Sequence, residues 1–183
     1  MTTLINILTL SRILLAAIIF VLLMTPDGYL LALVLFFLAG VTDYFDGYLA
    51  RKYNAVSQLG EILDPIADKI LILFVLFGLA INLSSYLIGF VGAAIMTREI
   101  WVGAIRDYNA RNGKSDATKV TFMAKIKTSV QLSTLSVYLF GLSINNMLVI
   151  IVADIFLFIS LFITLYTGLI YTINSFKNNE SLE

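Results

Sequence analysis

Six long apolar runs, separated by short polar stretches, constrain the fold of this chain more than any other feature. They cover residues 13–24, 29–42, 70–83, 86–97, 129–142 and 147–173. At about 20 residues for each membrane-spanning helix, a chain of 183 residues has room for about six crossings. We therefore predict an all-α membrane protein with six transmembrane helices, preceded by a short amphipathic N-terminal segment. We expect residues 1–183 to form a single integral-membrane domain.

The composition excludes several other classes of protein. The chain is 60% hydrophobic and 13% charged, whereas soluble domains are about 45–50% apolar and about 25% charged. Such a composition is not that of a disordered chain. The sequence contains no Cys, so it is not a disulfide scaffold, and its net charge of zero does not suit a nucleic-acid partner.

The basic residues fall on one side of the predicted bundle. The connections near 25–28, 82–86 and 143–147 contain no Lys or Arg. All twelve lie near the termini, in the segments near 50–65 and 106–127, or on the helix ends that border them. Because cytoplasmic loops carry the excess of Lys and Arg, we expect both termini and this side to face the cytoplasm.

Several apolar runs are shorter than the membrane they would cross. The second, third and fourth have only 12–14 residues, about 20 Å of helix, whereas the hydrocarbon core is about 30 Å thick. The charged ends of these helices would therefore lie below the lipid headgroups. Charges at that depth face a bundle interior or a water-filled cavity, so we predict a polar cavity that faces the cytoplasm.

Four aspartates form the densest cluster of charge. Asp43 and Asp46 are three residues apart and Asp64 and Asp68 four apart, so each pair shares one face of a helix. A short connection would bring the two helices together, and clustered carboxylates stay ionised only beside cations. Since the chain has no His or Cys, oxygen ligands favour Mg²⁺ or Mn²⁺. Four carboxylates suffice for two ions per site, the arrangement used in phosphoryl displacement.

Small residues and an arginine accompany these acids. Gly47, Ala50 and Gly60 leave room beside the helices for a bulky group such as a nucleotide. Arg51 offers a planar guanidinium that matches phosphate oxygens.

The stretch from Asp43 to Asp68 reads D-x2-D-G-x2-A-R-x8-G-x3-D-x3-D, and it resembles the motif of the CDP-alcohol phosphatidyltransferases. The resemblance implies transfer of a phosphatidyl group from a CDP-linked lipid to an alcohol, with release of CMP. It also implies a multi-pass protein of the bacterial inner membrane that forms a homodimer. By this resemblance Asp43, Asp46 and Asp64 bind metal, and Asp68 completes the metal site and acts as the general base. The cytidine-diphosphate contacts would be Gly47, Ala50, Arg51 and Gly60.

Asn6, Thr9 and Arg12 form a polar stripe on the otherwise apolar first helix. One interpretation is an amphipathic segment that lies at the membrane interface. The resemblance favours another, because family members often carry Asn-x-x-Thr-x-x-Arg here, lining the nucleotide site.

A second cluster bears on the acceptor. Arg98 and Arg106 lie on the fourth helix, and Lys125 and Lys127 open the fifth. Cations facing the same cavity would bind a phosphomonoester, although topology alone also places Lys and Arg at cytoplasmic helix ends as anchors. The stretch from Arg98 to Gln131 resembles the bacterial subgroup whose acceptor is sn-glycerol 3-phosphate.

We therefore expect a lipid-embedded enzyme whose substrates are CDP-diacylglycerol and glycerol 3-phosphate, acting by a single in-line displacement. Three alternatives stay open. The acceptor of a sibling enzyme would be inositol phosphate, serine or phosphatidylglycerol. A divalent-cation transporter would use the aspartates as its transport site, and a structural membrane scaffold would leave them without a role.

Overall fold

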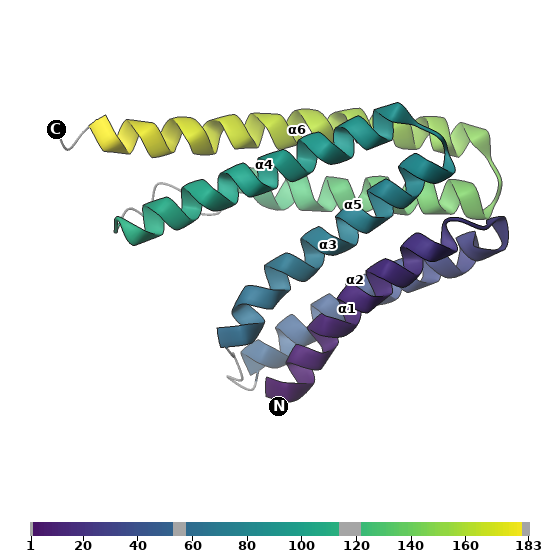
Figure 1. The fold of residues 1–183 in the computed structure, drawn as a ribbon, viewed down its shortest axis with the longest axis horizontal. Helices are drawn as coiled ribbons and strands as arrows, with labels where there is room; N and C mark the ends of the chain where they lie inside the picture. The colour runs from purple at the N-terminus through teal and green to yellow at the C-terminus, as the bar shows by residue number, and fades with distance from the viewer. Residues whose placement is uncertain (1, 53–57, 114–121, 181–183) are drawn as a thin grey trace.

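The computed structural model describes residues 2–52, 58–113 and 122–180, and within these ranges it contains six α-helices and no strand. The side chains at 2–5, 44, 46–51, 58–59, 61, 122, 124–125 and 177–180 lie outside that description. The elements in chain order, labelled in Figure 1, are α1 (Thr2–Leu22), η1 (Pro26–Gly28), α2 (Tyr29–Lys52), α3 (Gln58–Asn82), α4 (Tyr86–Arg111), α5 (Phe122–Ser143) and α6 (Met147–Glu180).

The N-terminal part of the chain differs from the expectation of a separate amphipathic segment. Helix α1 runs without a break from Thr2 to Leu22. The reason is local: this stretch contains neither Gly nor Pro, so nothing interrupts the helix.

The charged segments that follow the second and fourth apolar runs, and the one that precedes the third, belong to the same helices as those runs. Helices α2, α3 and α4 have 24, 25 and 26 residues, about 36–39 Å at 1.5 Å per residue. Among the described residues, three segments are long and apolar enough to span a membrane: Pro26–Asp43, Tyr86–Arg111 and Met147–Phe176.

The three described connections lie at one end of the molecule, on the right in Figure 1, and both chain termini lie toward the other end. Pro26 opens the short helix η1 between α1 and α2, and Gly28 closes it. A Cβ at Gly28 would lie 2.3 Å from the carbonyl oxygen of Leu22, so only glycine fits this turn. Ser84 and Asn145 adopt positive φ angles of 49° and 50° in the other two connections.

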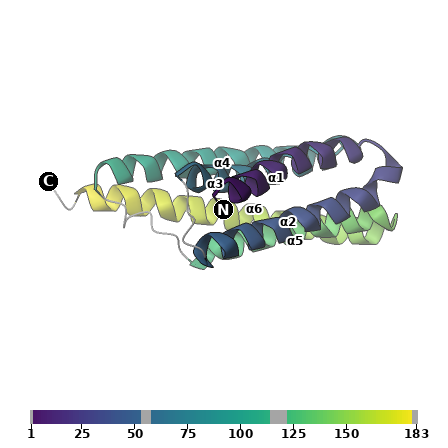
Figure 2. The same cartoon turned by 90° about the horizontal axis from the view of Figure 1, so that it is seen from below.

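The helices form two groups that diverge away from these connections. Helix α1 packs against α2 and α3, α6 packs against α4 and α5, and α5 also contacts α2 and α3. Figure 1 shows α1 to α3 fanning away from α4 and α6 toward the end that holds the termini, and Figure 2 shows α2 beside α5. The helices therefore lie closest at the connection end.

Apolar side chains fill the connection end. Leu23, Leu79, Ile88, Leu142 and Ile150 are buried, and each lies within a few residues of a connection. Toward the opposite end the buried residues include many polar ones, among them Thr9, Arg12, Arg98, Asn109, Lys127, Gln131 and Ser175. Large apolar side chains such as Tyr86, Phe90, Leu148 and Phe162 are exposed on the outside. Polar groups inside and apolar groups outside are typical of a protein surrounded by lipid.

Asn82 ties the end of α3 to the connection between α1 and α2. Its Nδ2 donates hydrogen bonds of 2.7 Å to the Leu23 carbonyl and of 2.7 Å to the Tyr29 hydroxyl oxygen. We expect Asn82→Ala to lower the free energy of unfolding by about 1–2 kcal/mol, since two partly buried acceptors lose their donor. Thermal unfolding of the purified protein in detergent measures the change.

Ser143→Ala is the matched control. The Ser143 hydroxyl donates to the Phe140 carbonyl of its own helix and makes no bond to another described helix, so the expected change stays within about 0.5 kcal/mol. Equal free energies of unfolding for the Asn82 variant and the control would show that the two Asn82 hydrogen bonds do not stabilise the bundle.

Candidate functional site

The side chain of Arg12 joins three helices at one point. Its Nη1 lies 2.8 Å from Oδ1 of Asp43 on α2 and donates a 2.6 Å hydrogen bond to Oδ1 of Asp68 on α3. The Arg12 side chain is fully buried, whereas Asp43 and Asp68 are 48% and 44% exposed. One guanidinium therefore supplies the positive charge between two carboxylates that open toward solvent or headgroups.

Thr9 makes a parallel contact one helical turn earlier. Its hydroxyl donates a 2.7 Å hydrogen bond to Oδ1 of Asp64. Thr9 and Arg12 are three residues apart on α1, and their acceptors are four apart on α3, so two polar stripes face each other along the helix pair. Thr9 and Arg12 are both buried, which an amphipathic segment at the membrane interface would not require. Asn6 lies one turn before Thr9 and is half-buried.

The structure brings together three of the four predicted carboxylates, those of Asp43, Asp64 and Asp68, around α1. Gly60 is buried on α3. The remaining predicted contacts lie on α2, but their side chains are outside the described ones: Asp46, Gly47, Ala50 and Arg51.

The donor set at this point suits a hard divalent cation. It consists of carboxylate oxygens, and two of them already converge on a single positive nitrogen. Among the described side chains, no three acids lie close enough together to form a metal cluster by themselves. The arrangement thus fits a cation in charge and ligand type, with Arg12 between two of the ligands.

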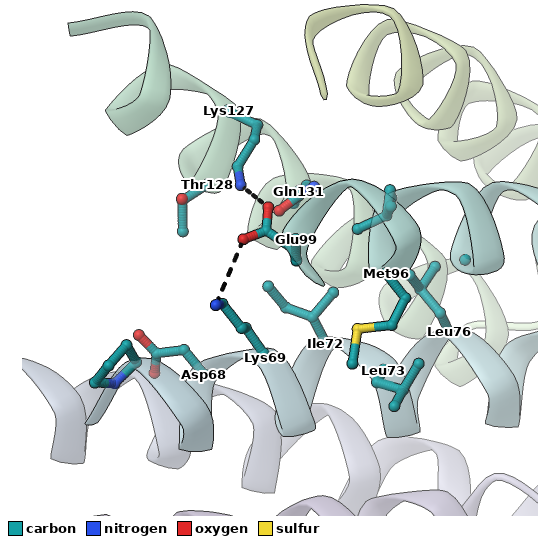
Figure 3. Close-up of a pocket in the computed structure, with 13 residues that line it drawn as sticks. Asp68, Lys69, Ile72, Leu73, Leu76, Met96, Glu99, Lys127, Thr128 and Gln131 are labelled. Carbon is teal, nitrogen blue, oxygen red and sulfur yellow. Dashed lines mark hydrogen bonds and ion pairs between the residues drawn. The ribbon is translucent and has the colours of Figure 1, made fainter. Parts of the chain in front are cut away.

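A second charged cluster gathers around Glu99 on α4. Its Oε1 accepts a 2.9 Å hydrogen bond from Nη1 of Arg98 and another from Nζ of Lys127 on α5. Lys69 on α3 lies 3.9 Å from the other carboxylate oxygen, Oε2. Figure 3 shows Lys127 and Lys69 approaching Glu99 from opposite sides.

One pocket connects the two clusters. It has a volume of about 160 Å³ and lies between α3, α4 and α5. Asp68 and Lys69 line one wall, Glu99 and Lys127 line the other, and Ile72, Leu76 and Ile95 form its apolar inner part. Two carboxylates and two ammonium groups therefore face one small cavity, which has ample room for several water molecules or a small polar molecule.

Two of the predicted acceptor contacts do not line this pocket. Arg98 donates from Nη2 to the Thr167 hydroxyl at 3.0 Å. Arg106 donates to the Tyr171 hydroxyl at 3.2 Å and stacks over the Tyr171 ring at 4.9 Å. Both arginines thus point to α6. Lys127 lines the pocket, and the side chain of Lys125 lies outside those described.

Lys69 and Glu99 are pocket residues that the sequence analysis did not predict as site residues. The sequence contains a hint of both. Lys69 directly follows Asp68, and Glu99 is an acid inside an apolar span, where charged residues usually have a function. Asp154, another intramembrane acid, accepts a 2.5 Å hydrogen bond from the Tyr138 hydroxyl on α5. Its partner therefore lies within the same chain.

Comparison with known proteins gives a consistent result. A sequence model of the family described as CDP-alcohol phosphatidyltransferase matches residues 2–166. A protein from Rickettsia bellii (strain RML369-C) is 38% identical over 148 residues, which cover 80% of each chain. Another from Escherichia coli (strain K12) is 34% identical over 134 residues, 72% of this chain and 73% of the relative. Both relatives are named CDP-diacylglycerol–glycerol-3-phosphate 3-phosphatidyltransferase.

We expect Arg12→Gln to lower the free energy of unfolding by about 1–3 kcal/mol when no divalent cation is present. The substitution removes the positive charge that Asp43 and Asp68 share, and leaves two nearby carboxylates without it. Chemical denaturation in detergent, with a chelator present, measures the effect.

Arg111→Gln provides the comparison for this prediction. Arg111 pairs with Asp107 at 2.7 Å, but both side chains are well exposed, so the expected loss is below about 1 kcal/mol. A loss for the Arg12 variant no greater than for the Arg111 variant would refute the bridging role.

Proposed function

The chain belongs to the CDP-alcohol phosphatidyltransferase family, and from this we propose that it is a transferase of phospholipid biosynthesis. It transfers the phosphatidyl group from CDP-diacylglycerol to sn-glycerol 3-phosphate, giving phosphatidylglycerophosphate and CMP. Relatives of 32–38% identity that carry the name of this activity support the assignment. The single structural observation behind it is the pocket that places Asp68 opposite the Glu99–Lys127 pair.

The pocket matches the two needs of such an acceptor. A hydroxyl group must lose its proton as it attacks phosphorus, and Asp68 offers a carboxylate for that proton. A phosphomonoester must be held by cations, and Lys127 offers an ammonium group in the same cavity.

Proteins of this family use divalent metal ions. We propose that Asp43, Asp46, Asp64 and Asp68 hold two of them, Mg²⁺ or Mn²⁺. When bound, the ions neutralise the charge that develops on the diphosphate. Thr9 orients Asp64 through its 2.7 Å hydrogen bond, and Arg12 orients Asp43 and Asp68 in the same way.

Asp68 is the proposed general base. Oδ1 accepts the hydrogen bond from Arg12, so we assign proton acceptance to Oδ2. The acceptor hydroxyl gives its proton to Oδ2 and its oxygen bonds to the phosphorus of the phosphatidyl group. The bond between this phosphorus and the CMP oxygen breaks in line, and CMP leaves with the electron pair.

The other proposed contacts are with the nucleotide and with the acceptor phosphate. The CDP-lipid would be bound by Asn6, Thr9, Arg12, Gly47, Ala50, Arg51 and Gly60. The acceptor phosphate would be bound by Arg98, Arg106, Lys125 and Lys127. Lys127 meets the pocket directly, whereas Arg98 and Arg106 would have to leave Thr167 and Tyr171 to do so.

The proposed topology has six membrane crossings, with both termini and a polar cavity on the cytoplasmic side of the bacterial inner membrane. The position of the Lys- and Arg-free connections at one end of the bundle supports it. We further propose one domain over residues 1–183, assembled as a homodimer.

The acyl chains of the lipid substrate would leave the site between helices. An apolar groove of about 410 Å³ runs between α2 and α5 and is lined by Phe36, Gly40 and Leu132 among others. Gly40 lies one helical turn before Asp43, and nothing lies within 4 Å of its Cβ position. A chain in this groove would enter the lipid directly from the aspartate cluster.

An acceptor panel tests the reaction. The purified protein, given CDP-diacylglycerol, is expected to release CMP with glycerol 3-phosphate and not with serine, inositol phosphate or phosphatidylglycerol. CMP release with another acceptor alone would assign the chain to a sibling activity. Metal flux across liposomes without CMP release would assign it to transport.

Asp68→Asn tests the base. We expect turnover to fall by at least about 100-fold, the lower range for the loss of a general base, while calorimetry still shows metal bound through the three remaining aspartates. Asp27→Asn is the control, since Asp27 is exposed in the connection at the opposite end and should leave turnover unchanged. Unchanged turnover in the Asp68 variant would refute the base assignment.

A further inference from the structure

One carboxylate gathers basic side chains from three helices beside the pocket. Glu99 and Arg98 come from α4, Lys127 from α5 and Lys69 from α3. Arg98 and Lys127 share the same oxygen of Glu99, and Lys69 faces the other. Three positive groups therefore surround a single negative one.

Burial shows that these are not surface anchors. The side chains of Arg98 and Lys127 are 7% and 8% exposed, and that of Glu99 is 15% exposed. Basic residues that only anchor a helix extend their charge to the membrane surface, and Lys127 does not. A buried ammonium group needs a partner, and among the described residues Glu99 supplies the only carboxylate that pairs with Lys127.

The three cations differ in what else they can bind. Arg98 is held from behind by Thr167, and Gly168 leaves room for its side chain because a Cβ there would lie 2.9 Å from Arg98 Cγ. Lys69 and Lys127 instead line the pocket. An ammonium group has three donors, so each lysine can bind Glu99 and still donate to an anion.

The charge around Glu99 suits an anion. Three cations and one carboxylate leave positive charge in excess there, and the Asp68 carboxylate on the opposite wall is paired with Arg12, so the excess is available to a phosphomonoester. Without Glu99, three cations would repel one another across a partly buried site, and Lys127 would lose its partner. The carboxylate thus keeps the two lysines close enough to bind one phosphate.

We propose that Glu99 is a positioning residue of the acceptor site, and that Lys69 binds the acceptor phosphate together with Lys127. This inference rests on the proposed transfer to glycerol 3-phosphate and identifies what selects a phosphorylated acceptor. Glu99 acts through the lysines and does not touch the acceptor. An acceptor without a phosphomonoester gives the two lysines no phosphate to bind, so it would bind more weakly.

Glu99→Gln and Lys69→Gln test the proposal by steady-state kinetics. For Glu99→Gln we expect the KM for glycerol 3-phosphate to rise about tenfold, with kcat and the KM for CDP-diacylglycerol within about twofold of wild type. The Lys69 side chain is 39% exposed, so its replacement should not prevent folding. For Lys69→Gln we expect the KM for glycerol 3-phosphate to rise about fivefold. Glu99→Asp keeps the charge and should restore part of the affinity.

Asp154→Asn is the matched control, because Asp154 is also an intramembrane carboxylate bonded to a neighbouring helix, through Tyr138. It should leave both KM values unchanged. Equal KM values for the Gln variants and wild type would overturn the proposal, and so would a fall in kcat with KM unchanged. If Glu99→Gln does not fold, the Lys69→Gln result decides.

Calorimetry with inorganic phosphate separates this inference from the proposed reaction. Wild type should bind phosphate, and both Gln variants should bind it about tenfold more weakly. Weaker binding in the variants supports the subsite even if the acceptor panel assigns a different phosphorylated acceptor. Equal binding in all three proteins overturns it even if wild type releases CMP with glycerol 3-phosphate.

Discussion

The pairing of charges inside an apolar bundle is the constraint on which the rest of the structure depends. A charge moved into a lipid-like environment costs several kcal/mol unless a partner compensates it. Arg12 meets that requirement between Asp43 and Asp68, and Glu99 meets it for Lys127 and Arg98. The Arg12 pairs also link α1 to α2 and α3, and the Glu99–Lys127 pair links α4 to α5, so contacts that neutralise charge also hold these helices together. The charged residues of the candidate site therefore also contribute to the packing of the bundle.

The two ends of the bundle have different tasks. At the connection end, apolar residues such as Leu79 and Ile88 fill the space between helices. Asn82 bonds the end of α3 to the connection between α1 and α2. At the other end the two groups of helices diverge (Figure 1), and the charged residues line the space between α3, α4 and α5. The apolar packing thus closes one end of the bundle, and the charged pocket lies where the helices diverge.

Spacing within one helix determines which side chains share a face, and this much could be predicted from the sequence. The facing stripes of Thr9 and Arg12 on α1 and of Asp64 and Asp68 on α3 follow from that rule. Spacing does not say which helix packs against a face, so the contacts of Arg98 and Arg106 with α6 could not be predicted. The same holds for the Tyr138–Asp154 pair, and for the convergence of Lys69 and Lys127 on Glu99. Side chains such as that of Asp46 lie outside the description, and their roles stay predictions.

The two clusters have opposite compositions, and α3 joins them. Asp43 and Asp68 contact Arg12 and Asp64 contacts Thr9, whereas Lys69, Arg98 and Lys127 surround Glu99. The change of sign falls between Asp68 and Lys69, which are consecutive and line the same pocket. A cluster of acids and a cluster of bases thus meet within one peptide unit. In the proposed reaction, an acceptor that carries a hydroxyl and a phosphate a few bonds apart would have its two ends matched by these neighbours, and binding of its phosphate by Lys69 would direct its hydroxyl toward Asp68.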